Sequence, residues 1–413
     1  MPHQSKSSAS SGPQWHRLST ADSPAERSAT AAAFDPKRRS WYHFGGLGQQ
    51  RHGDLWALQF SGAPTSGDAA APSTSLSGTW RCLHSGGSDA PCARSKASLT
   101  LVTLPSGVDV LILFGGWAGG KQDKLADMWA WPLPSLADVI PEAAGAEGTW
   151  FRVDQTGQVP ESRSAHSVAQ LPNGSGGKAR LLLFGGIGAR KFGDAFIGQV
   201  GLAASASGKQ PRHLLCHWLC VAGMNEGLPP RSSYGSLHVV PKSSIDGAAE
   251  SAASTALLFG GLTCGQLNDV VAATVPVQGK DGSAAVERFE VFAPSEGSAP
   301  APYKRGRHAT AVIRDPADGA LLLLVYGGTD LRNHDERFHA FDLTRRVWRR
   351  SVKPAGDAPP GMECHAMALV PSTDGAEDRG HLVVYGGWRV NKGWVEGVHC
   401  ISVESLLATM RIA

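Results

Sequence analysis

The sequence predicts an all-β fold, a six-bladed β-propeller whose N-terminal strand closes the last blade. Three observations carry this prediction. A short apolar strand that ends in an aromatic residue and two glycines occurs six times, an aromatic-led strand follows five of these copies, and an unmatched tryptophan strand stands near residue 15. A repeat at such spacing is typical of blades, because each unit can bury its apolar surface only against its neighbours.

The glycine pair ends the second strand of each unit. Successive pairs begin 70, 70, 75, 67 and 59 residues apart. Glycine is expected there because the chain must turn with positive φ close to a neighbouring backbone, where a side chain would not fit. The pairs are Gly45 and Gly46, Gly115 and Gly116, Gly185 and Gly186, Gly260 and Gly261, Gly327 and Gly328, and Gly386 and Gly387.

Two further positions recur after the glycine pair. A large apolar residue, usually two residues after an acidic one, marks the third strand: Trp56, Trp129, Phe196, Val271, Phe338 and Val398. The fourth strand opens with another aromatic residue, which we expect to be buried between blades. These residues are Trp80, Trp150, Trp218, Phe289 and Trp348.

A first strand precedes each glycine pair. Its leading loop carries an arginine in five units, at Arg27, Arg94, Arg163, Arg231 and Arg305, and Met362 in the sixth. Histidine follows three residues later at His166, His308 and His365. Four strands per unit and six units make six four-stranded blades.

The two ends of the chain are predicted to share one sheet. Trp15 opens a tryptophan strand with no unit before it, whereas the last unit has no such strand after Val403. Pairing the two ends would leave no sheet edge exposed. The predicted organisation is a disordered tail at 1–14, one propeller at 15–403 and a short C-terminal tail at 404–413. Small-residue insertions at 62–78, 201–210 and 243–254 are predicted to be surface loops.

The charges are nearly balanced, with 39 Lys and Arg against 36 Asp and Glu and a formal net charge of +3. Proteins that bind nucleic acid or membrane surfaces use an excess of basic residues, so we expect neither partner. Residues 1–14 hold no apolar segment, and the longest apolar run, 321–326, is too short to cross a bilayer. With seven scattered cysteines, we expect a cytoplasmic protein with reduced thiols.

These patterns resemble the kelch family over roughly residues 15 to 403. The resemblance rests on the six FGG or YGG turns, the acidic-x-aromatic step and the tryptophan strand. The units are longer than the usual kelch period of about 50 residues, and the surplus lies in the insertions. The resemblance implies a kelch-repeat propeller. Some kelch proteins are enzymes, but this sequence contains none of the catalytic signatures sought in it, so we expect no catalytic activity.

Two motifs resemble chemical sites but do not fit them. Residues 115–121 nearly match a phosphate-binding loop, but Gln122 replaces the magnesium-binding Ser or Thr and a strand pattern follows. The second motif is the group His213, Cys216, His217 and Cys220. In a strand its two cysteines would lie about 13 Å apart, too far for one zinc ion. We expect no catalytic residue, no metal and no cofactor.

The loops after the glycine pairs and before the first strands are expected on one face, around the channel mouth. Two interpretations of the five arginines remain open. They bind a carboxylate or acidic peptide, as the arginines that line kelch peptide pockets do, or they tie the blades together through acids and carbonyls. Four other loop residues have the make-up of an interface hot spot: Trp117, Trp388, Arg389 and Lys392.

The predicted function is a scaffold or adaptor that binds a partner protein or an acidic peptide segment. A more specific version is a ubiquitin-ligase subunit, because residues 405–410 faintly resemble an elongin-binding box with Met410 in place of cysteine. The alternative is an enzyme that acts on a sugar acid or similar small anion at the channel mouth. The arginines would then hold the substrate, and His166, His308 or His365 would be the general base.

Overall fold

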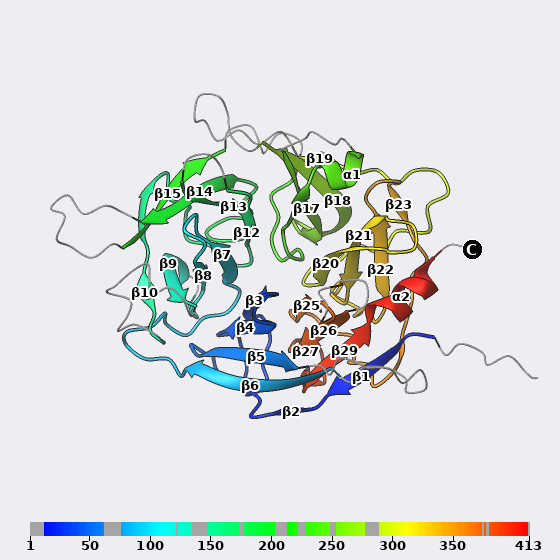
Figure 1. The fold of residues 1–413 in the computed structure, drawn as a ribbon, viewed down its shortest axis with the longest axis horizontal. Helices are drawn as coiled ribbons and strands as arrows, with labels where there is room; N and C mark the ends of the chain where they lie inside the picture. Colours follow the sequence, from blue (N-terminus) through cyan, green and yellow to red (C-terminus); the bar gives the residue numbers. More distant parts are fainter. Residues whose placement is uncertain are drawn as a thin grey trace, which may run out of the picture.

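The computed structural model describes residues 12–61, 76–120, 123–133, 148–173, 177–202, 213–221, 228–247, 253–276, 289–373, 376 and 380–411. In these residues six small sheets stand around a common axis, which confirms the six-bladed β-propeller (Figure 1). Outside the described residues lie positions 1–11 of the predicted N-terminal tail and much of the three predicted insertions, at 62–75, 203–210 and 248–252.

The first three blades each run from an innermost strand at the channel to a short outer strand. Blade 1 contains β3 (Ala31–Asp35), β4 (Ser40–Phe44), β5 (Leu55–Ser61), β6 (Ser77–His84) and β2 (Thr20–Ala21). Blade 2 contains β7 (Ser98–Thr103), β8 (Asp109–Trp117), β9 (Lys124–Pro132) and β10 (Phe151–Arg152). Blade 3 contains β12 (Ser167–Leu171), β13 (Ala179–Phe184), β14 (Ala195–Leu202), β15 (Leu214–Cys220) and β11 (Asp154–Gly157).

The last three blades follow the same order. Blade 4 contains β16 (His238–Pro241), β17 (Ser254–Leu262), β18 (Gln266–Val275) and β19 (Glu290–Val291), with the short helix α1 (Ser243–Asp246) after β16. Blade 5 contains β20 (Ala309–Arg314), β21 (Leu321–Tyr326), β22 (Phe338–Asp342) and β23 (Val347–Trp348). Blade 6 contains β25 (Ala366–Val370), β26 (His381–Tyr385), β29 (Val398–Ser402), β1 (Gln14–Leu18) and β24 (Ala355–Gly356), and a hairpin of β27 (Trp388–Arg389) and β28 (Gly393–Trp394) belongs to its loop.

The core lies in the seams between blades. Six apolar clusters are formed, and each joins residues of two adjacent blades. The second strands contribute most fully: every residue of β13 and of β21 is buried, because both faces of these strands are covered by neighbouring sheets. The aromatic residues predicted to be buried between blades are at most 5% exposed: Trp15, Trp80, Trp150, Trp218, Phe289 and Trp348.

The closure predicted from Trp15 is confirmed. Strand β1 pairs antiparallel with β29, so that Trp15 lies opposite Ile401 and Leu18 opposite Val398. The ring is therefore locked by hydrogen bonds between the two ends of the chain. Figure 1 shows the blue N-terminal strand beside the red C-terminal one.

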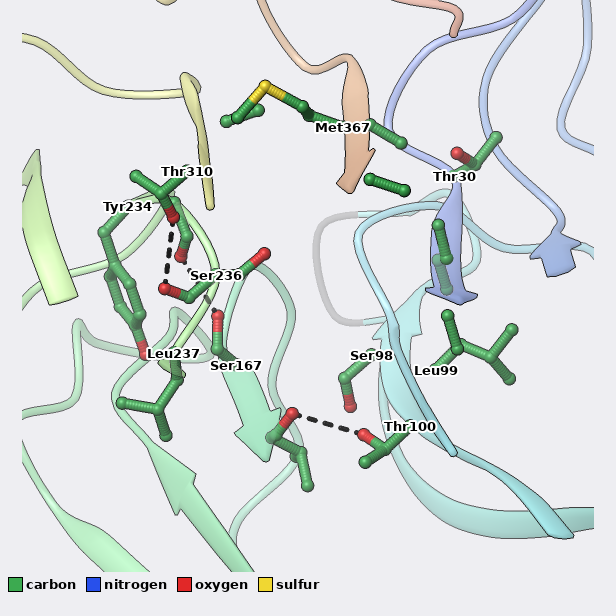
Figure 2. A pocket seen from close by; sticks show the side chains of 18 of the residues that line it. Thr30, Ser98, Leu99, Thr100, Ser167, Tyr234, Ser236, Leu237, Thr310 and Met367 are labelled. Carbon is green, nitrogen blue, oxygen red and sulfur yellow. Dashed lines mark hydrogen bonds between the residues drawn. The ribbon is translucent and has the colours of Figure 1, made fainter. Parts of the chain in front are cut away.

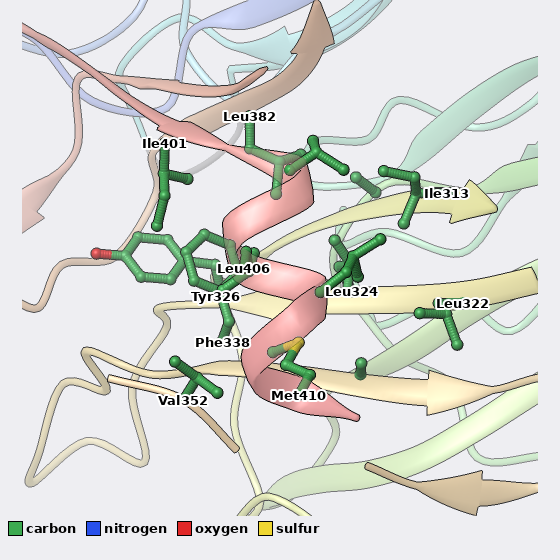
Figure 3. Packing of buried hydrophobic residues seen from close by; sticks show 14 of the residues in the cluster. Ile313, Leu322, Leu324, Tyr326, Phe338, Val352, Leu382, Ile401, Leu406 and Met410 are labelled. Carbon is green, nitrogen blue, oxygen red and sulfur yellow. The ribbon is translucent and has the colours of Figure 1, made fainter. Parts of the chain in front are cut away.

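The segment after β29 differs from the predicted short tail. It forms α2 (Val403–Met410), whose N-cap Ser402 accepts a hydrogen bond from the Ser405 N–H. Its buried side chains, Val403, Leu406, Leu407 and Met410, have helical spacing and pack into the seam of blades 5 and 6 (Figure 3). A partner could reach these side chains, which belong to the segment that resembles an elongin-binding box, only if α2 left the propeller. Within the described part of the chain, no helix has both the length and the apolar content needed to span a membrane.

Candidate binding face

A central channel with a cavity volume of about 580 Å³ runs between the innermost strands of the six blades. Small and hydroxyl-bearing side chains line much of its wall. Figure 2 shows Thr30, Ser98, Thr100, Ser167 and Thr310 around this space. Some of these hydroxyls bond to neighbouring blades: Thr100 donates to the carbonyl of Val168. The channel wall is thus polar without being strongly charged.

A closed ring of six backbone hydrogen bonds surrounds the axis where the innermost strands begin. Each member has φ between 53° and 61° and donates its N–H to the carbonyl of the member in the preceding blade, at 2.6 to 3.0 Å. The members are Ala29, Lys96, Ala165, Ser233, Arg307 and Cys364. They follow the arginine register by two residues. Of these six described ring members, Lys96 and Arg307 carry charged side chains.

The five register arginines are buried, with at most 3% exposure, and each forms an ion pair with an aspartate of its own blade at 2.6 to 2.9 Å. Each also donates to the carbonyl of its blade's first glycine at 3.0 to 3.2 Å. The pairs are Arg27 with Asp54, Arg94 with Asp127, Arg163 with Asp194, Arg231 with Asp269, and Arg305 with Asp335.

These contacts support the second interpretation of the arginines, that they tie the propeller together. An external carboxylate would have to displace an internal one from a desolvated site, which is costly. Burial alone would raise the pKa of Asp54, but the hydrogen bonds and the charge of Arg27 outweigh it and lower that pKa below its usual value. Asp54 is therefore charged at neutral pH, and each of the five arginines already has an internal carboxylate partner.

The backbone at the arginine position also joins adjacent blades. Its carbonyl accepts a hydrogen bond from the second glycine of the preceding blade, as in Gly46 to Arg94, and the six equivalent bonds measure 2.9 to 3.1 Å. Blade 6 keeps this bond through Met362 but lacks the ion pair. There Met362 and Val395 are buried in one apolar cluster, so an apolar contact replaces the charged one.

The three histidines proposed as general bases lie in the seams. His166, His308 and His365 pack edge-on against Phe114, Phe259 and Tyr326, with ring centroids 5.2 to 5.6 Å apart. Burial is the main cause that lowers the pKa of each to about 3. A neutral histidine with so low a pKa is a weak proton acceptor, and its packing explains why the sequence repeats it.

Trp117 and Trp388 occupy equivalent positions directly after a glycine pair. The backbone of this position bridges to the residue that follows the register arginine or methionine in the same blade, as in Ser95 with Trp117 and Glu363 with Trp388. The other blades carry Leu47, Ile187, Leu262 and Thr329 there. Both tryptophans are half-buried, so each presents part of an indole ring on the loop face.

Trp117 is surrounded by cations from three different segments: Arg51 in the loop after β4, Lys96 in the loop before β7 and Lys124 at the start of β9. The guanidinium carbon of Arg51 lies 4.2 Å from the ring centroid, the ammonium of Lys124 4.9 Å and that of Lys96 5.6 Å. The indole N–H donates to the carbonyl of Gly120 at 2.8 Å, which orients the ring. We call Arg51, Lys96, Trp117 and Lys124 the cation–tryptophan cluster.

Three other basic residues of the same face already have a partner. Arg190 lies 2.8 Å from Glu161, Arg307 lies 2.8 Å from Glu363, and Lys191 donates to a backbone carbonyl. Within the part of the chain that the structure describes, no carboxylate lies within 4.0 Å of the charged nitrogens of Arg51, Lys96 or Lys124. Three cations without a carboxylate partner among the described residues thus lie around one indole ring.

The second predicted patch forms the hairpin of β27 and β28. Trp388 lies opposite Trp394 in this hairpin, and Arg389 lies 3.6 Å from Glu336. At its tip Val390 is 48% exposed and Lys392 is exposed. Among the described residues Lys392 has no ion-pair partner, so the hairpin presents one cation and an apolar tip and is less basic than the cation–tryptophan cluster.

The two motifs that resemble chemical sites lie in strands, as predicted. Residues 115–117 end β8 and the chain returns in β9, so no helix follows the loop, while Lys121 and Gln122 lie outside the described residues. Cys216 and Cys220 both lie in β15, the first buried beside Trp218 and the second exposed.

A comparison of the sequence with protein-family models and with curated proteins found no match. The repeat pattern and the propeller fold therefore carry the functional argument.

Proposed function

We propose that the protein is a kelch-type interaction module, a scaffold or adaptor that binds a partner protein through its loop face. The cation–tryptophan cluster is the observation that carries the proposal. Tryptophan and arginine are enriched in binding hot spots, and here Trp117 at the end of β8 lies beside Arg51 on a rigid ring. Three cations without an ion-pair partner among the described residues favour an acidic segment of the partner.

The register arginines support this proposal indirectly. Because internal aspartates occupy them, they are poorly suited to hold a substrate carboxylate, and the seam histidines are poorly suited to act as bases. The cation–tryptophan cluster, in contrast, is accessible to a partner, and its composition suits binding. A cytoplasmic location stays a prediction from the sequence.

The proposal is tested by affinity purification and mass spectrometry with a charge-matched pair of variants. Lys96→Ala with Lys124→Ala removes two charges from the cluster. Lys178→Ala with Lys242→Ala removes one exposed and one half-buried charge at the other ends of the blades, before β13 and after β16. We expect wild type and the second variant to retain the same partners and the first to lose them. Equal recovery by all three proteins would contradict binding through this part of the loop face.

A further inference from the structure

The cation–tryptophan cluster has a charge that selects among acidic ligands. Arg51, Lys96 and Lys124 contribute three positive charges, and the nearby Asp123 contributes one negative charge, so the described groups sum to +2. The Asp123 carboxylate also accepts a hydrogen bond from the N–H of Gly120 and is thus engaged in its own turn. A carboxylate ligand would neutralise half of this charge, whereas a phosphomonoester, at about −1.5 to −2, would neutralise nearly all of it.

The geometry brings at least two cations to the same side of the indole. Each of the three lies over the ring within 5.6 Å of its centroid, and a ring has only two faces. The cations also repel one another electrostatically. Burial, followed by the charge of Lys96 and then that of Arg51, lowers the pKa of Lys124, while Asp123 acts in the opposite direction. A multivalent anion between them would relieve this repulsion.

The backbone holds these groups in place before any ligand arrives. Lys124 lies directly opposite Trp117 in the pairing of β8 with β9. Lys96 belongs to the closed backbone ring and follows Ser95, which bridges to Trp117. Both lysines are half-buried rather than free surface side chains. Because these side chains are already restricted, they lose less conformational entropy on binding an anion than mobile lysines would.

We infer that the cation–tryptophan cluster is a phosphate-binding site that recognises a phosphorylated side chain of the partner protein. The inference rests on the proposed function and makes it more specific. The phosphate oxygens would accept hydrogen bonds from the ammonium and guanidinium groups, and Trp117 would pack against the neighbouring residue of the partner. Phosphorylation of the partner would then control its binding.

The test uses one fluorescein-labelled peptide of Gly, Ala and Ser with a central phosphoserine, and the same peptide with Ser or Glu at that place. In fluorescence anisotropy with the full chain, we expect the phosphopeptide to bind at least tenfold more tightly than either control. Lys96→Ala should weaken it at least fivefold without unfolding the protein, because Ala29 and Ala165 occupy the equivalent ring positions with φ of 54° and 53°. Lys178→Ala should have no effect.

Three results would overturn the inference. The first is equal affinity for the phosphorylated, Glu and Ser peptides, and the second is unchanged phosphopeptide affinity in Lys96→Ala. The third is binding to vesicles that contain a phosphoinositide without preference for the phosphopeptide. If partner capture survives phosphatase treatment of the lysate but is lost in the Lys96→Ala and Lys124→Ala variant, the phosphate assignment fails while the scaffold function stands.

Discussion

In the seam between blades 3 and 4, a Cβ atom on Gly185 would lie only 2.7 Å from the carbonyl oxygen of Arg231. The same close approach recurs at the first glycine of every pair, where the corresponding distances are 2.4 to 3.0 Å. Glycine is therefore required at the first position of the pair for two reasons: the backbone has a positive φ, and the next blade leaves no space for a side chain. The repeat that identifies the fold is also the place where neighbouring blades are hydrogen-bonded.

Gly185→Ala should destabilise the protein more than Gly177→Ala. The two glycines have φ values of 61° and 63°, but a Cβ on Gly177 meets no atom within 4 Å. At Gly177 the substitution should lower the free energy of unfolding by about 1–2 kcal/mol, because alanine disfavours the left-handed backbone. At Gly185 the close contact with the Arg231 carbonyl should lower it further. Urea denaturation of the two variants measures the difference. Equal free energies of unfolding would show that the seam can relax around the methyl group.

Arg163→Met should lower the free energy of unfolding by about 3 kcal/mol, because it leaves the Asp194 carboxylate without its partner in a desolvated seam. The double variant with Asp194→Val should recover much of that loss, as blade 6 is built with Met362 and Val395. Both variants should keep partner binding when folded. A stable Arg163→Met protein that no longer bound its partner would instead favour the ligand-binding interpretation of the arginines.

Removal of residues 12–19 should unfold the propeller, since it deletes β1 and exposes the edge of β29. A milder change is Trp15→Ala, which should lower the free energy of unfolding by about 3–5 kcal/mol. Trp15 is 1% exposed, and its ring centroid lies 5.3 Å from that of Tyr326 and 5.5 Å from that of Phe338. Differential scanning calorimetry provides the measurement. A monomeric truncated protein that melted at the wild-type temperature would contradict closure by the two chain ends.

The stability of the protein should fall as the pH is lowered from about 6.5 to about 4. The pKa of His365 is lowered to about 3 in the folded protein, mainly by burial, and is about 6.5 in an unfolded chain. Between these values the unfolded chain binds a proton that the folded protein does not, so each such histidine gives a slope of about 1.4 kcal/mol per pH unit. His166 and His308 should add equal slopes.

The control for this pH dependence is His365→Phe. Whatever its effect at pH 7, the variant should show a smaller decrease in the free energy of unfolding between pH 6 and pH 4.5 than the wild type. Parallel curves for the two proteins would show that His365 is not a source of the slope.

The fold could be predicted because its determinants are local and repeated. Glycine pairs, aromatic strand starts and the unmatched Trp15 strand are visible in the sequence, and each has a physical reason that follows from blade packing. The helix α2 was missed because eight residues at a chain end contain a single short apolar stripe, which is not distinctive. The closed backbone ring was missed as well. The sequence signal that accompanies it is a small residue, usually serine, after the register arginine. A positive φ at Lys96 or Arg307 cannot be recognised from the residue type.

The binding face could be predicted only in part. Trp117 is recognisable as a tryptophan outside the repeat register. Arg51, Lys96 and Lys124 lie in three separate segments of the chain, and the folded ring brings them to one indole. The role of the arginines could not be decided from sequence, because a guanidinium group suits an internal aspartate as well as an external carboxylate. The structure favours the internal partner through distances and burial that no sequence pattern contains.

Binding through Trp117 is tested most directly by the affinity of the captured partner for Trp117→Leu, measured by isothermal titration calorimetry beside Arg190→Ala. Leucine occupies the equivalent position in blades 1 and 4, as Leu47 and Leu262, so the fold should tolerate it, and Arg190 is an exposed residue of the same face paired with Glu161. We expect unchanged melting for both proteins and an affinity about 30-fold weaker for Trp117→Leu alone, the loss of about 2 kcal/mol that marks a hot spot. Wild-type affinity in Trp117→Leu would contradict binding through this residue.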